Sequence, residues 1–210
     1  MQASIIDNYR DLPLGKWEDI IAANDIEDEV DRQVAVIAIL TGLTTRQVLH
    51  LPVTEYADYA SKAAFLTKPL PKIGRPASSY RAGGFTLIPS TDLRKITTAQ
   101  YIDFQTFAPE GDKRLVEILS VFLVPQGKDY NEGYDIGEVQ TAIREDLSVQ
   151  DAVYLSAFFL SKYAALIRAT KTSLERMLKR ERKPERKEAI RERLATLSRG
   201  DGAGWPRWTP

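Results

Sequence analysis

The side chains that most often carry out catalysis or bind metals are scarce in this chain. His50 is its only histidine, and it contains no cysteine. A zinc site needs several N, S or O ligands at set spacings, and a Ser–His–Asp triad would have to use His50, near which no G-x-S-x-G turn occurs. We therefore expect His50 to be a surface or half-buried histidine beside Leu49 and Leu51, and we expect no metal and no cofactor.

Three further patterns match chemical motifs only in part. Gly83-Gly84 fits neither glycine-rich phosphate motif and is typical of a hairpin turn. The loop 129–135 lacks the D-x-[DN]-x-[DN]-G order and the closing Glu of a calcium loop. Glu138, Glu145 and Asp146 are typical of acids on a helix surface. The sequence thus predicts that the protein is not an enzyme.

The strongest charge feature is the segment 175–199, which contains ten Lys or Arg and five Glu, although the whole chain has a formal net charge of zero. This asymmetry predicts a basic appendage on a mildly acidic body. A protein partner is the favoured use of this segment, because no aromatic residues interleave the charges as nucleic-acid binding would favour. Nucleic-acid contact and a bare solvated face are the alternatives. The candidates for phosphate contact are Arg176, Lys179, Arg180, Arg182, Lys183, Arg186 and Lys187.

The terminal sequence GDGAGWPRWTP places Trp205 and Trp208 among Gly and Pro residues. It predicts an extended tail over 200–210. Tryptophan is enriched at binding hot spots. The two rings either fold back onto the domain's own surface or dock into a neighbouring subunit or partner.

Composition places the chain among globular proteins. Its 210 residues, 43% of them hydrophobic, suit one domain with a core or one domain with an appendage. The lack of cysteine excludes disulfides and favours a reducing compartment. The N-terminus shows no secretory signal, and no run approaches 18 uninterrupted apolar residues, so we expect no membrane association.

Helical periodicity dominates the N-terminal third. Trp17, Ile20 and Ile21 lie on one helical face. A second helix is predicted over 26–41, with acidic residues in its first turns, where the helix dipole favours them, and a stop at Gly42. A short helix capped by Thr44 or Thr45 follows, and another begins after Pro52.

A Pro-rich connector over 68–79 leads to the only convincing β segment, 80–96, predicted as a small hairpin that must pack on the helices. Four helices follow between Thr97 and Ile167, joined by short polar turns. The last starts at Ser148, with Asp151 three residues later in the manner of a capping box. Pro184 is predicted to end or kink this helix after Arg182 or Lys183. A final short helix is predicted over 185–197.

The long last helix carries an approximate heptad pattern. Val153, Leu160, Ile167 and Leu174 recur every seven residues, with Ser156, Tyr163, Thr170 and Met177 between them. It predicts either the buried stripe of a long domain helix or, in part, a seam between chains. For partner contacts the sequence nominates Leu160, Ile167, Leu174, Met177, Trp205 and Trp208.

Four segments together resemble virion-morphogenesis proteins of tailed bacteriophages, in particular tail-assembly-chaperone-like proteins of phages of Bacteroidetes-type hosts. They are VAVIAILTGLT (34–44), LPVTEY (51–56), KITTAQYIDFQ (95–105) and LSVFLVPQGKDYN (119–131). The similarity covers about 17–167 and is one of packing residues and turns. The extension after Ala169 is not part of it.

The sequence predicts a mainly α protein, made of a compact multi-helix domain (1–169, with the hairpin near 80–96), a basic helical extension (170–199) and a tail (200–210). The resemblance implies a non-enzymatic phage assembly protein that binds other virion proteins and forms homo-oligomers. It would lie in the host cytoplasm during assembly. A ring or connector (neck) protein retained in the virion is the first alternative, and a nucleic-acid-binding module using the basic helix is the second.

Overall fold

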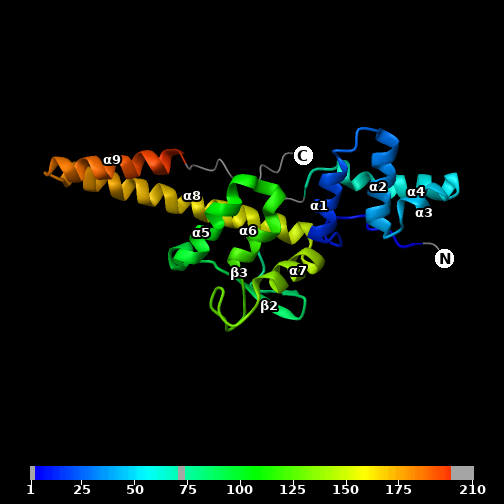
Figure 1. The fold of residues 1–210 in the computed structure, drawn as a ribbon, viewed down its shortest axis with the longest axis horizontal. Helices are drawn as coiled ribbons and strands as arrows, with labels where there is room; N and C mark the ends of the chain where they lie inside the picture. Colours follow the sequence, from blue (N-terminus) through cyan, green and yellow to red (C-terminus); the bar gives the residue numbers. More distant parts are fainter. Residues whose placement is uncertain (1–2, 71–73, 200–210) are drawn as a thin grey trace.

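The computed structural model describes residues 3–70 and 74–199. It is mainly helical, with a small antiparallel sheet and a long C-terminal helix, which confirms the predicted fold class. The elements fall into an N-terminal helical group, a central part that holds the sheet, and a pair of long helices that extends away from both (Figure 1).

The N-terminal group contains four α-helices and one 3₁₀ turn. Side-chain capping sets the start of two of these helices: Asp28 accepts hydrogen bonds from the amides of Val30 and Asp31, and Thr44 forms a capping box with Gln47. Gly42 ends its helix in the left-handed conformation, at φ 74°. The elements are α1 (Leu14–Ala23), α2 (Glu29–Thr41), α3 (Thr45–Leu49), α4 (Val53–Ala63) and η1 (Ala64–Thr67).

The central part wraps helices around a short sheet. Thr97 caps α5 through a capping box with Gln100. Seven of the eight residues of α6 are buried, so this helix is apolar on all sides and lies in the core. The elements are β1 (Tyr80–Ala82), β2 (Phe85–Pro89), η2 (Leu93–Lys95), α5 (Thr98–Phe107), η3 (Ala108–Arg114), α6 (Leu115–Phe122), β3 (Leu123–Pro125) and α7 (Ile136–Asp146).

The sheet contains a strand that the sequence did not predict. β1 and β2 form the expected hairpin, but β3 pairs antiparallel with the other edge of β2, so that Ile88 faces Val124. The hairpin is also shorter than 80–96, because Leu93 lies in the 3₁₀ turn η2 rather than in a strand. β3 follows α6 without a loop, and it gives the backbone of β2 a second partner.

The N-terminal group joins the central part where α1 meets α7 and the start of α8. The amide of Leu14 donates to the carbonyl of Leu147, and that of Val149 donates to Leu12. Arg144 on α7 forms an ion pair with Glu18 on α1 at 2.7 Å. Burial raises the pKa of Glu18, while the charge of Arg144 opposes that rise.

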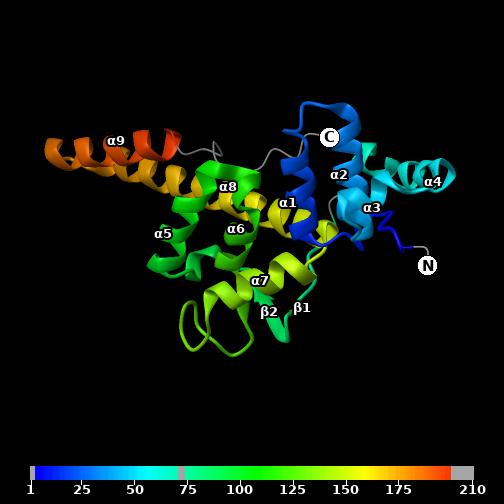
Figure 2. The same cartoon turned by 45° about the vertical axis from the view of Figure 1, so that its right-hand side comes forward.

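The two last helices dominate the shape of the molecule. α8 (Val149–Arg180) begins at Ser148, whose hydroxyl accepts from the amide of Asp151, as predicted. It runs for 32 residues, through the boundary proposed at 169/170, without a break. Its end at Arg180 comes before the predicted one, and Pro184 starts α9 (Pro184–Arg199). α9 runs back along α8, and the pair projects beyond the rest of the fold (Figures 1 and 2). We call residues 170–199 the arm.

The turn between β1 and β2 lies close to α7, and substitutions at its two glycines test this contact. Both turn glycines have positive φ, 54° at Gly83 and 80° at Gly84. A Cβ on Gly83 would lie 2.5 Å from the Cβ of Ala142, whereas one on Gly84 would meet nothing within 4 Å. We expect Gly84→Ala to lower the free energy of unfolding by about 1–2 kcal/mol through backbone strain. Gly83→Ala should lower it by about 1–3 kcal/mol more through overpacking.

Urea denaturation of both variants measures this difference. Equal losses at the two glycines would contradict the close contact between the turn and α7.

Candidate interaction surface

The inner half of α8 belongs to the core and offers little to a partner. Phe159 is fully buried and stacks on Phe122 of α6, with 4.5 Å between ring centroids. Leu155 and Val153 are buried in the same stretch. Leu160 and Ile167, two of the predicted contact residues, are half-buried, and Leu160 packs against this core.

The outer half of α8 packs on α9, so part of the predicted seam lies inside the chain. Leu174 on α8 and Ile190 on α9 are both buried, at 8% exposure each. α9 is the described element that runs beside this stretch of α8 in both views (Figures 1 and 2). Met177, one turn further out, is 54% exposed. Of the two predicted contact residues in the described part of the arm, Leu174 and Met177, Met177 is therefore the accessible one. Trp205 and Trp208 lie outside the described residues.

The cations that the sequence predicts as candidates for phosphate contact lie at the end of the arm. All seven lie in the segment 176–187, which spans the end of α8, the connecting turn and the first turn of α9. Six of them are exposed and Lys187 is half-buried. The segment holds two acids, Glu181 and Glu185, so it carries a net charge of +5. We call it the basic tip.

Glu181 organises the turn of the basic tip. Its carboxylate accepts hydrogen bonds from the amides of Lys183 and Arg182 and lies 3.9 Å from the guanidinium of Arg186. These amides, and the nearby positive charges, lower the pKa of Glu181. Its charge is included in the net charge of +5 of the basic tip. Within the described part of the chain, the other cations of the tip form no ion pair.

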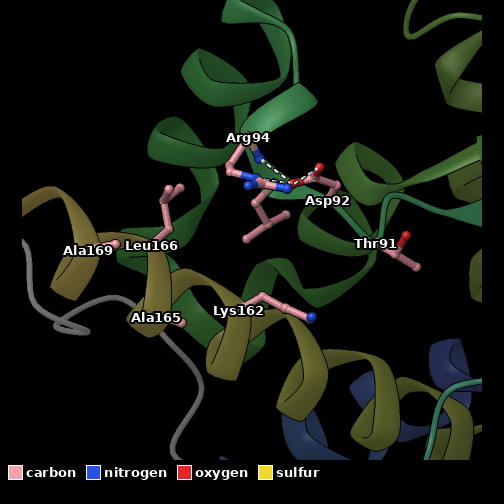
Figure 3. A pocket seen from close by; sticks show the side chains of 8 residues that line it. Thr91, Asp92, Arg94, Lys162, Ala165, Leu166 and Ala169 are labelled. Carbon is pink, nitrogen blue, oxygen red and sulfur yellow. Dashed lines mark hydrogen bonds and ion pairs between the residues drawn. The ribbon is translucent and has the colours of Figure 1, made fainter.

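A groove lies where the inner part of α8 passes the turn η2 (Figure 3). It has a volume of about 430 Å³ and is lined by Thr91, Asp92, Leu93, Arg94, Lys162, Ala165, Leu166 and Ala169. Its floor is made of small and apolar side chains, and cations lie at its rim. No sequence signal marks it, because its two walls are about 70 residues apart in the chain.

The two cations that line this groove each make a contact, Arg94 an ion pair and Lys162 a cation–π contact. Asp92 binds Arg94 through both of its oxygens, at 2.8 and 3.0 Å. These bonds and the amide of Arg94 lower the pKa of Asp92 to about 2, so this carboxylate stays ionised at all but strongly acid pH. The ammonium of Lys162 lies 5.3 Å from the ring centroid of Phe158.

Two of the features that partly matched chemical motifs, His50 and the loop that holds Tyr130, make hydrogen bonds within the fold. His50, which follows the last residue of α3, is exposed, and its Nδ1 lies 2.7 Å from the carbonyl oxygen of Arg46. In the loop 126–135, Tyr130 donates a hydrogen bond of 2.7 Å to Asp103 of α5. Across residues 3–70 and 74–199, no three His, Asp or Glu side chains gather into a set that could hold a metal ion.

One helix meets the length and composition of a membrane span. It is α8, and 28% of its most apolar 18-residue window is buried in the fold. A core helix of a globular protein passes the same test.

Comparison with known proteins gives no relative for this arrangement. No protein-family model, curated protein or solved structure matches the chain.

Packing within the arm can be tested by a matched pair of substitutions. Leu174→Ala removes a buried side chain between α8 and α9 and should weaken their packing by about 2–3 kcal/mol. Met177→Ala, one turn away on the exposed side, should change stability by less than about 0.5 kcal/mol. Hydrogen exchange of the α9 amides measures the opening of the arm. If Met177→Ala loosened α9 as much as Leu174→Ala, our assignment of the inner and outer faces would be wrong.

Proposed function

We propose that this chain is a non-enzymatic assembly protein of a tailed bacteriophage that binds other virion proteins in the manner of a tail-assembly chaperone. The observation that carries the proposal is the arm, which projects a charged surface away from a closed core. The resemblance of 17–167 to phage morphogenesis proteins supplies the biological setting. An enzymatic function has less support, because the residues that line the groove at η2 include no nucleophile paired with a base.

The residues of the partner surface follow from their exposure. Met177 and the basic tip are accessible at the end of the arm. Leu160 and Ile167 would contribute their outer edges only. Leu174 would act indirectly by holding α9 in place. Trp205 and Trp208 follow α9, and we propose that they dock into the partner as aromatic anchors.

Complementation of a phage that lacks the gene tests this function. We expect loss of the gene to give particles with absent or incomplete tails, and the wild-type chain to restore them. Trp205→Ala with Trp208→Ala should reduce infectious particles at least about tenfold, since hot-spot aromatics each contribute 2 kcal/mol or more. Val53→Ala, at a residue that is 83% exposed on α4, is the control and should complement fully.

Normal tails in the absence of the gene would overturn the proposal. Full complementation by the double tryptophan variant would overturn only the docking role of the tail.

A ring or connector protein that stays in the particle is the main alternative. Mass spectrometry of purified virions separates the two functions. A connector is present in a fixed number of copies per particle, whereas an assembly chaperone is absent from the mature particle.

Nucleic-acid binding is the second alternative, and the seven cations gathered at the basic tip favour it. It predicts that affinity for a DNA duplex falls steeply between low and moderate salt, because each neutralised phosphate releases counterions. Binding that is undetectable, or independent of salt, would exclude this alternative.

A further inference from the structure

The charge of the basic tip has a counterpart elsewhere in the same chain. Residues 25–31 (DIEDEVD) contain five acids and no Lys or Arg, and all five side chains are exposed. We call this stretch, which links α1 to α2 and forms the first turn of α2, the acidic segment. None of its carboxylates forms an ion pair with the described residues. Arg32 follows it, with its guanidinium bound to the carbonyl of Ile26, and offsets one of the five charges.

The two charged regions account for the electrostatic asymmetry of the chain. The basic tip carries +5 and the acidic segment −5, while the remaining residues hold equal numbers of acids and bases. Each region also exposes one apolar side chain, Met177 at 54% and Val30 at 61%. The two surfaces are thus complementary in charge, and each also exposes an apolar side chain.

The two regions do not meet within one molecule. The basic tip lies at the free end of the arm, and the acidic segment lies in the N-terminal helical group at the opposite half of the long axis (Figures 1 and 2). α8 is one continuous helix from the core to the tip, so the arm does not fold back on that group. Contact between the two regions therefore requires a second copy.

We propose that the basic tip of one copy docks onto the acidic segment of a second copy, so that this protein associates head to tail. The two surfaces in contact differ, which makes the contact heterologous. Such a contact produces a closed ring if the rotation between copies closes, and an open filament if it does not.

The strength of this association comes from several weak terms. A single exposed ion pair contributes little, because solvent screens it. Five positive charges on one surface and four or five negative charges on the other act together with the exposed side chains of Met177 and Val30. The resulting contact is weak and depends on salt. Ring closure, or concentration of copies on a growing particle, strengthens it through effective concentration.

This inference does not rest on the phage setting. A head-to-tail protein could serve as a chaperone, a ring or another assembly. Infectivity tests the proposed function, whereas the association of the purified chain tests the inference.

The experiment measures sedimentation velocity of the full-length chain and of two charge-reversal variants. Arg182→Glu with Lys183→Glu lowers the net charge of the tip from +5 to +1 just before the N-terminus of α9, where helices tolerate negative charge. Asp25→Lys with Glu27→Lys changes the net charge of the acidic segment from −5 to −1 before α2 begins. The control, Arg46→Glu with Arg81→Glu, reverses two exposed cations on α3 and β1. Circular dichroism verifies that each variant is folded.

We expect the wild type and the control to associate, with an association constant that falls at least about tenfold between roughly 50 and 500 mM NaCl. Each charge-reversal variant alone should be monomeric. A mixture of the two should associate again, because the unchanged basic tip of one variant then meets the unchanged acidic segment of the other.

A wild type that stays monomeric at low salt would overturn the proposal, and so would association that persists in either variant alone. Failure of the mixture to associate would overturn it as well, since the surfaces would then not be each other's partners. If the wild type is monomeric and its tip binds a DNA duplex instead, the nucleic-acid alternative replaces this proposal.

Discussion

Burial of the first half of α8 is the constraint on which the rest of the structure depends. This half lies against α6, which is itself buried almost completely, and the stacked rings of Phe159 and Phe122 fix the two helices together. Because α8 continues as a helix beyond the core, its second half must project into solvent. At about 1.5 Å per residue, the eleven residues from Thr170 to Arg180 extend about 16 Å further.

A projecting single helix would leave its apolar side in water, and α9 resolves this. The charged turn and Pro184 reverse the chain, after which Ile190 and Leu174 are both buried. The arm therefore uses its few apolar residues for its own packing and presents charge outside. Recognition through the arm must rely on electrostatics and on single exposed side chains such as Met177, rather than on a broad hydrophobic seam.

The sequence predicted what depends on neighbouring residues and missed what depends on distant ones. The caps at Thr44, one of two candidates for its helix, and at Ser148 were predicted because each is satisfied within three residues. β3 was missed because its partner β2 lies more than thirty residues earlier and three residues carry no clear alternation. The groove at η2 was missed for the same reason. The sequence predicted the seven cations of the basic tip as candidates for phosphate contact. That they lie at one end of the molecule follows from the structure, in which the chain reverses direction between α8 and α9.

The distribution of charge also separates the classes of partner open to the basic tip. A surface that binds nucleic acid gains from a positive field around the whole protein, because the phosphate backbone extends well beyond the contact. Here the net charge is zero and the acidic segment would repel phosphates at the other end of the molecule. In the association that we propose, the same segment attracts the tip of another copy, and a neutral chain adds no net repulsion between copies. The charges that weaken the case for a long nucleic acid are those that favour a row of identical molecules, each tip placed on the next acidic segment.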